Sequence, residues 1–215
     1  DLPYKEKGLR AGEKLLRKLW NASKLVDSLT PDDEVQMDHD DLQELDRWML
    51  ASLDEEVAYI TEKLDAYEFS KARDRLRSFF WHTFCDDYLE IAKQRIREGE
   101  DDSAAYTLQV AHRRFLKLFA PFLAHITEEL WRDMYGTVGD ESVHRADWPE
   151  PLGLDANVEA GETALDVVSA LRRYKSDNQL SMNASLDSVK VYGDIAGFAE
   201  DIRRVMHVDE LETSD

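Results

Sequence analysis

Hydrophobic residues in the first part of the chain recur every three or four positions, which places them along one side of a helix. This pattern predicts a first helix that ends at the Leu29–Asp33 break, followed by helices over 41–65, 68–97 and 103–135. Because proline lacks a backbone N–H, we expect Pro121 to kink the fourth helix. Long amphipathic helices with short connections are typical of an antiparallel bundle.

The pattern changes after Gly136, where glycines and prolines interrupt the chain for about 25 residues. Within this stretch, residues 142–148 are expected to form a short extended piece that closes over the bundle. A further amphipathic helix is predicted over 162–177.

The last part of the chain alternates between the periods of a strand and a helix. We predict a strand over 188–192, a helix over 195–206 and a second strand over 207–211, with parallel pairing. The predicted fold class is therefore mainly α: a helical-bundle domain over 1–150, followed by a small α/β subdomain over 151–215.

The composition is strongly acidic, with a formal net charge of −19. Acidic residues are spread along the chain, which suits a protein kept soluble in concentrated salt. An acidic disordered chain is the alternative, but 43% hydrophobic and 10% aromatic residues contradict it. The single cysteine, Cys85, fits a reducing compartment, and no apolar run is long enough to cross a membrane. We therefore expect a cytoplasmic, halophilic protein without a membrane partner.

One segment reverses this charge. Residues 5–24 hold seven basic and two acidic side chains, a balance of +5, so the rest of the chain sums to −24. A basic segment in an acidic protein indicates a polyanionic partner. The alternative is a solvated helix face with the pairs Glu6–Arg10 and Glu13–Arg17 four residues apart.

The spacing within this segment favours nucleic acid. Lys14, Lys18 and Asn21 follow each other at intervals of four and three, with Arg17 and Lys24 beside them. An asparagine amide can pair with a base edge, and a lysine can reach base acceptors or phosphates. These are the candidate binding residues.

An aromatic platform often accompanies such contacts in RNA recognition. Trp20 is the aromatic residue in this segment, but its phase with Leu16 and Leu19 predicts a place in the core.

Catalytic motifs are not found in the sequence: it has no glycine-rich phosphate loop, no nucleophile elbow and no paired cysteines. His82, Cys85 and Asp86 fall within one helical turn, but one cysteine and one histidine are a weak metal signal. A packed helix face is the preferred interpretation, so we assign no catalytic and no metal-binding residues.

Several strings resemble the anticodon-binding domain of class I aminoacyl-tRNA synthetases for branched aliphatic amino acids, in the right order. They are LRKLWNAS over 16–23, DRWML over 46–50, YEF over 67–69, FWHTFCDDYLE over 80–90 with Lys93, LFAPFLAHITEELW over 118–131 and HRADWP over 144–149. The later string LRRYKSDNQLSMNA over 171–184 is similar to archaeal valyl enzymes, and together with the acidic composition this resemblance indicates a haloarchaeal type. Leucyl and isoleucyl enzymes share the bundle strings.

The resemblance implies a role outside the active site. Neither signature of the class I active site, His-Ile-Gly-His or Lys-Met-Ser-Lys-Ser, occurs in the sequence. ATP and Mg²⁺ would then belong to the parent ligase, and this chain would be inactive alone and hold no cofactor. Its partners would be the tRNA anticodon arm and the catalytic and editing domains of the same enzyme. It would read the valine anticodon, whose second and third bases are A and C.

The resemblance also assigns residues. In bacterial relatives a lysine, an asparagine and a basic residue of the first helix contact the anticodon, and these align with Lys18, Asn21 and Lys24, with an upstream contact near Lys7. The sequence departs from those relatives at Leu25, where they place a stacking aromatic.

Two other interpretations stay open. The basic helix would dock on an acidic protein if the chain were a helical interaction module. A small enzyme would use His82 or Cys85. RNA binding with a salt dependence separates both from the tRNA interpretation.

The acidity generates a first prediction. Carboxylates repel one another less when the Debye length shortens from about 10 Å at 0.1 M salt to about 3 Å at 1 M. The melting temperature should therefore rise between about 0.1 M and about 2 M KCl, as followed by circular dichroism. An unchanged or falling melting temperature would contradict the halophilic interpretation.

Overall fold

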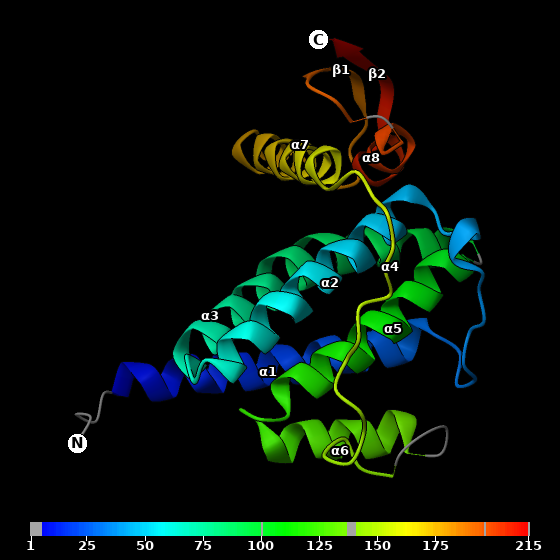
Figure 1. The fold of residues 1–215 in the computed structure, drawn as a ribbon. Coiled ribbons are helices and arrows are strands. Elements are labelled where there is room, and N and C mark those ends of the chain that lie inside the picture. Colours follow the sequence, from blue (N-terminus) through cyan, green and yellow to red (C-terminus); the bar gives the residue numbers. More distant parts are fainter. Residues whose placement is uncertain (1–5, 100, 137–140, 196, 215) are drawn as a thin grey trace.

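The computed structural model describes residues 6–99, 101–136, 141–195 and 197–214. Helices of the first part form a bundle, and a small α/β unit lies against one end of it (Figure 1). The bundle elements in chain order are α1 (Glu6–Leu29), η1 (His39–Asp41), α2 (Glu44–Asp65), α3 (Phe69–Ser78), η2 (Phe79–Tyr88), α4 (Leu89–Glu98), α5 (Asp102–Phe119) and α6 (Ala124–Tyr135). The mainly α prediction is confirmed.

The third predicted helix, over 68–97, is a continuous rod of three parts. α3 passes directly into η2, a π-helical segment, and η2 passes into α4. The wider π turn keeps Phe80, Phe84 and Tyr88 buried in the core. Phe84 packs against Phe115 of α5 with ring centroids 4.8 Å apart. These aromatic contacts hold the rod against α5.

The fourth predicted helix is in fact two helices, so the expectation of a single kinked helix over 103–135 is wrong. The proline ring at Pro121 clashes with the carbonyl four residues earlier and supplies no N–H, which ends α5 at Phe119. After a short turn, α6 begins at Ala124 and runs in a different direction (Figure 1).

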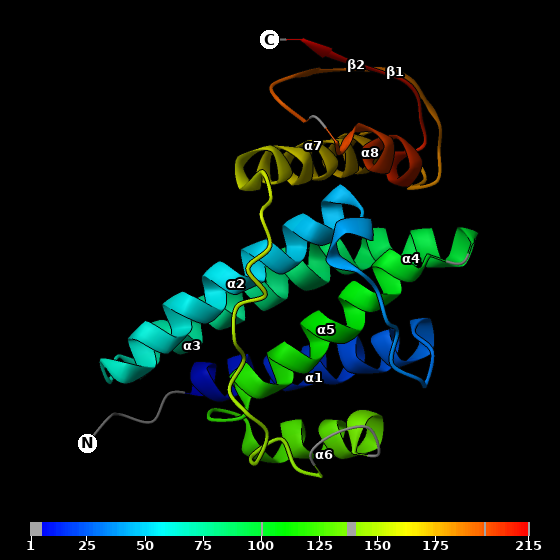
Figure 2. The same ribbon diagram turned by 45° about the vertical axis from the view of Figure 1, so that its right-hand side comes forward.

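The connection from α6 to the α/β unit follows the side of the bundle (Figure 2). Its start is a turn at 143–145 and not the extended piece expected over 142–148, because Glu128 accepts hydrogen bonds from the Ser142 hydroxyl and the Val143 N–H. Further along, the Trp148 indole donates to Thr61 (2.8 Å). The connection is therefore fixed to the bundle by polar contacts.

The α/β unit contains α7 (Val158–Asp177), β1 (Leu186–Tyr192), α8 (Ala199–Met206) and β2 (Val208–Ser214). β1 and β2 pair in parallel, as predicted, and β2 is longer than expected at its end. The predicted helices over 162–177 and 195–206 correspond to α7 and α8, with α7 beginning earlier and α8 later.

α7 packs closely on α2. The buried Trp48 indole of α2 donates to the Val158 carbonyl (3.1 Å). A Cβ atom at Gly161 would lie 2.2 Å from the Trp48 ring, so only glycine permits this approach.

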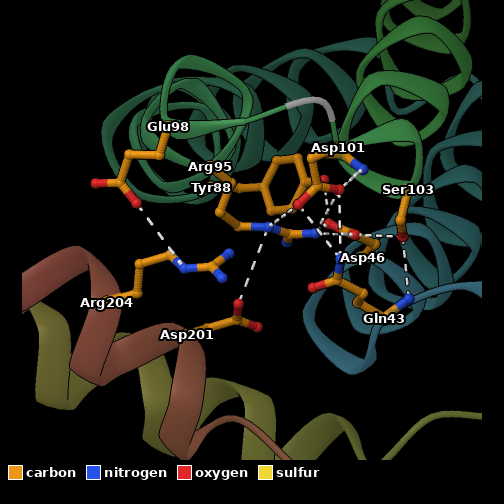
Figure 3. Close-up of polar contacts among 10 residues, drawn as sticks. Gln43, Asp46, Tyr88, Arg95, Glu98, Asp101, Ser103, Asp201 and Arg204 are labelled. Carbon is orange, nitrogen blue, oxygen red and sulfur yellow. Dashed lines mark hydrogen bonds and ion pairs between the residues drawn. The ribbon is translucent and has the colours of Figure 1, made fainter.

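A buried ion cluster joins three bundle helices. The Arg95 guanidinium of α4 is fully buried and donates two hydrogen bonds to Asp46 of α2, at 2.9 and 2.7 Å (Figure 3). It also donates to Asp101, the N-cap of α5, at 2.9 and 3.0 Å. Ser103 and Tyr88 donate to the same Asp46 carboxylate. Every polar atom of this cluster thus has a partner close by, as buried charges require.

α8 meets the same cluster. Its Asp201 carboxylate lies 3.9 Å from the Arg95 Nε, and Arg204 lies 3.8 Å from Glu98 of α4 (Figure 3). Burial raises the pKa of Asp201 to about 6, although Arg95 opposes the shift. Asp46 and Asp101 face the same space and raise it further.

Removing Arg95 should destabilise the protein. Arg95→Met leaves the Asp46 carboxylate buried without its counter-ion, which should lower the free energy of unfolding by about 3–5 kcal/mol in urea denaturation. Arg97→Met, on the exposed side of the same helix, is the matched control and should change it by less than about 0.5 kcal/mol. Equal effects would mean that the cluster does not stabilise the fold.

Asp201 should make stability depend on pH. Its folded pKa of about 6 lies above the unfolded value of about 3.9, so folding favours the protonated acid. The stability this gives is complete below about pH 4 and is lost as the pH rises through about 6. Relative to Asp201→Asn, the wild type should therefore lose about 1–3 kcal/mol of unfolding free energy between pH 4 and pH 7.5. Parallel pH profiles of the two proteins would contradict this.

Candidate nucleic-acid interface

One side of α1 is fixed into the bundle. Its core residues are Leu15, Leu19, Ala22 and Val26. Beside them, the buried Ser23 hydroxyl is 2.8 Å from His112 of α5, whose other ring nitrogen is 2.7 Å from the Tyr135 hydroxyl of α6.

His112, at the centre of this series of hydrogen bonds, is uncharged. Burial lowers the pKa of His112 to about 3, so the ring is neutral at physiological pH. A neutral ring offers one donor and one acceptor, which matches a hydroxyl on each side. The hydrogen bonds that link Ser23, His112 and Tyr135 therefore fix the rotation of α1 about its axis and decide which side chains face outward.

The outward side of α1 carries the predicted binding residues, and two of them have no partner. Lys14 is exposed and has no ion-pair partner among the described residues. Asn21 is exposed too, and its amide makes no hydrogen bond within the described part of the chain. They lie seven residues apart, two helical turns along the same side of α1. Lys7 lies within α1, but its side chain is outside what the structure describes.

The other two lysines are engaged by neighbouring helices. The Lys18 Nζ is 2.7 Å from Asp86 of η2, and the Lys24 Nζ is 2.5 Å from Asp133 of α6. The hydrogen bond that Lys24 donates to Asp133 is the main cause that raises the pKa of Lys24. Such exposed ion pairs contribute little to stability, so a phosphate can replace the carboxylate at small cost.

The arginines form the pairs that the four-residue spacing predicted. Arg10 pairs with Glu6 at 2.7 Å, and Arg17 pairs with Glu13 at 2.6 Å. Both pairs are exposed. The surface therefore combines features of the two interpretations: part of it is a salt-bridged helix face, and part of it is unpaired.

The core prediction for Trp20 is wrong, because 42% of this residue is exposed. The buried stripe follows Leu15, Leu19 and Val26, and a residue next to Leu19 is rotated by about 100° from it. Leu16, on the same side as Trp20, is exposed as well. The spacing of Leu15, Leu19 and Val26 was the signal that distinguishes the buried side from its neighbour.

Two indoles lie beside the basic side of α1. The Lys24 Nζ lies 5.6 Å from the Trp20 ring centre, and the Lys18 Nζ lies 5.5 Å from that of Trp81 on η2. No sequence pattern predicted that Trp81 approaches α1, because the two are far apart along the chain. Indole faces next to cations are able to stack on unpaired bases.

The cluster of His82, Cys85 and Asp86 does not form a reactive centre. Burial raises the pKa of the Cys85 thiol to about 12, so it stays protonated near neutral pH and is a poor nucleophile. His82 makes an exposed contact with Asp86 at 3.3 Å. Among the described residues, no group of three or more histidine, cysteine or acidic side chains is placed to hold a metal ion.

The fold and this surface define a helical-bundle domain that carries one basic helix, α1, on its surface. A family model of the anticodon-binding domain of tRNA ligase matches residues 46–191, more than half of the chain. The chain belongs to this family. The match begins after α1, so the basic helix lies outside it.

Known relatives extend the likeness to the whole chain. It is 59% identical to the valine–tRNA ligase of Haloarcula marismortui over 215 residues, which are 100% of this chain and 24% of that enzyme. The valine–tRNA ligases of Methanothermobacter thermautotrophicus and Pyrococcus furiosus are 35% and 34% identical, over 98% and 99% of this chain and 25% of each enzyme. The chain thus spans about a quarter of the length of these curated relatives.

The haloarchaeal relative agrees with the halophilic interpretation of the acidic composition. None of the helices in the described ranges is both long and apolar enough for a membrane span.

Proposed function

We propose that this chain binds the anticodon arm of valine tRNA as part of a valine–tRNA ligase. The observation that carries the proposal is the outward side of α1, where Lys14 and Asn21 lie unpaired beside two engaged lysines in a protein of net charge −19. The names of the relatives support the choice of valine over leucine or isoleucine. A helical protein-interaction module is the alternative, but nothing in the structure favours an acidic protein over RNA.

The residues of this surface would have different tasks. Asn21, whose amide oxygen and nitrogen make no hydrogen bond within the described part of the chain, would read a base edge through two hydrogen bonds. Lys14 would contact phosphate without regard to sequence. Lys18 and Lys24 would exchange their carboxylate partners for RNA, with Arg17 and Lys7 contributing charge at the margin.

Base stacking would fall to an indole. Leu25 cannot stack, and Trp20 is the exposed aromatic on the same helix. Its neighbour Lys24 would hold a phosphate while the ring covers a base.

The remaining activity would belong to other parts of the enzyme. Activation of valine with ATP and Mg²⁺, transfer to tRNA and editing would occur in catalytic and editing domains of the same cytoplasmic protein. We retain the division into a bundle domain over 1–150 and an α/β subdomain over 151–215 as part of the proposal, with the α/β unit buttressing α2 and α4 of the bundle.

Asn21 and Lys14 should affect aminoacylation differently. In the ligase that carries this segment, Asn21→Ala should reduce the preference for the valine anticodon over one changed at its second or third base, by about 1–3 kcal/mol in the ratio of kcat/KM values. Lys14→Gln should weaken binding of all tRNAs alike and lower the slope of log affinity against log salt by about one.

Matched controls lie far from α1. Asn183→Ala and Lys190→Gln remove an exposed amide and an exposed charge in the α/β unit and should leave both measurements unchanged. The proposal is wrong if the wild-type enzyme charges the altered tRNA as well as the native one. The assignment to Asn21 alone is wrong if the wild type discriminates and Asn21→Ala does so equally.

A further inference from the structure

A polar pocket lies on the surface formed by α2, η2 and α7, away from the basic side of α1. Its volume is about 360 Å³. Its lining has one basic side chain, Arg75, and these acidic ones: Glu55, Glu56, Asp87, Glu162 and Asp166. The lining of the pocket therefore has a higher proportion of acidic to basic side chains than this acidic protein has as a whole.

Two of these acids are already neutralised. Glu56 is buried and accepts hydrogen bonds from Arg75 at 2.5–2.9 Å. Asp87 pairs with Arg172 at 3.3 Å, and burial is the main cause that raises its pKa.

The other acids are exposed at the rim of the pocket. Glu55, Glu162 and Asp166 make no direct ion pair within the described part of the chain, although Glu162 is close enough to Arg75 to help raise the pKa of that guanidinium. They come from two helices, Glu55 from α2 and the other two from successive turns of α7. The pocket thus offers several carboxylates on opposite sides of one opening.

A buried hydroxyl in the same pocket also lacks a partner. Ser52 lines the pocket, is only 7% exposed, and its Oγ makes no hydrogen bond to any described residue. A buried polar group without a hydrogen bond is destabilising, so its presence here points to a ligand that supplies the missing bond.

The floor of the pocket is apolar. Trp48, Phe79 and Leu165 contribute to its lining. Phe79 belongs to η2, whose π turns also place Thr83 and Asp87 toward the pocket, at successive intervals of four. π-helical segments occur often at functional sites.

We propose that this pocket binds an aliphatic polyamine. Each terminal ammonium group donates three hydrogen bonds and each internal one donates two, which suits separate carboxylates and the Ser52 hydroxyl as acceptors. The methylene segments between them would lie on Trp48 and Phe79, as alkyl stems of cations do on apolar surfaces. A directly coordinated metal ion fits less well, because no three acidic groups among the described residues converge on one point.

The pocket shares no residue with the tRNA surface, so this inference does not depend on the proposed function. Calorimetric titration of the 215-residue chain with spermidine, at constant ionic strength, should give one site. Titration with MgCl₂ and with the monoamine Nα-acetyl-lysine amide, each at the same ionic strength, distinguishes a polyamine from a metal ion and from a lysine side chain of another protein segment.

Charge removal at the rim tests the location. Glu162→Gln with Asp166→Asn should weaken spermidine binding about tenfold, because two charge-assisted hydrogen bonds are lost without disturbing any ion pair. Glu159→Gln with Asp177→Asn removes the same charge from exposed positions of α7 outside the pocket and should change the affinity less than about twofold.

Ser52→Ala tests the depth of binding and should weaken it about threefold or more, as expected for one lost hydrogen bond. The proposal is overturned if spermidine does not bind, if both double variants weaken it equally, or if Mg²⁺ or the lysine amide binds as tightly as spermidine. An unchanged affinity of Ser52→Ala overturns the role of the buried hydroxyl.

Discussion

The buried guanidinium of Arg95 is the constraint on which the arrangement of the helices depends. A charge removed from water must have its partners in place, and those of Arg95 come from α2 and from the N-cap of α5, with a carboxylate of α8 nearby. Replacing such a cluster with apolar side chains often costs no stability, so we infer that its contribution is specificity. Only one packing of α2, α4 and α5 satisfies every donor and acceptor at once.

The α/β unit is positioned by contacts of several kinds, some of them with the residues around this cluster. Asp201 approaches the cluster from α8, Trp48 and Gly161 set the close approach of α7 to α2, and the fully buried Lys175 donates to the carbonyls of Met182 and Met206 at 2.8 Å. Burial lowers the pKa of Lys175. The contacts of Asp201, Trp48 and Gly161 join the α/β unit to the bundle, whereas those of Lys175 lie within the unit and hold α7 against the end of α8.

The ion pairs on the basic side of α1 bear on how it would bind RNA under the proposed function. Carboxylates of neighbouring helices pair with Lys18 and Lys24, and these exposed pairs are weak enough for the proposed RNA phosphates to replace them. High salt weakens any phosphate contact, and hydrogen bonds to bases and stacking on indoles are less sensitive to it. An unpaired amide at Asn21 and an exposed ring at Trp20 are therefore suited to recognition by a salt-adapted protein.

The sequence by itself determined what depends on neighbours along the chain: the helical stripes, the parallel strands, the charge reversal at 5–24 and the family strings. Tertiary structure alone decided the rest. The partners Asp46 and Arg95 are 49 residues apart, and Lys18 and Asp86 are 68 apart, so periodicity carries no information about either pair. Trp20 was misjudged because Leu16 and Leu19 alone also fit a stripe through Trp20; the longer spacing Leu15, Leu19 and Val26 marks the buried side, and the packing of α1 against α5 and α6 confirms it.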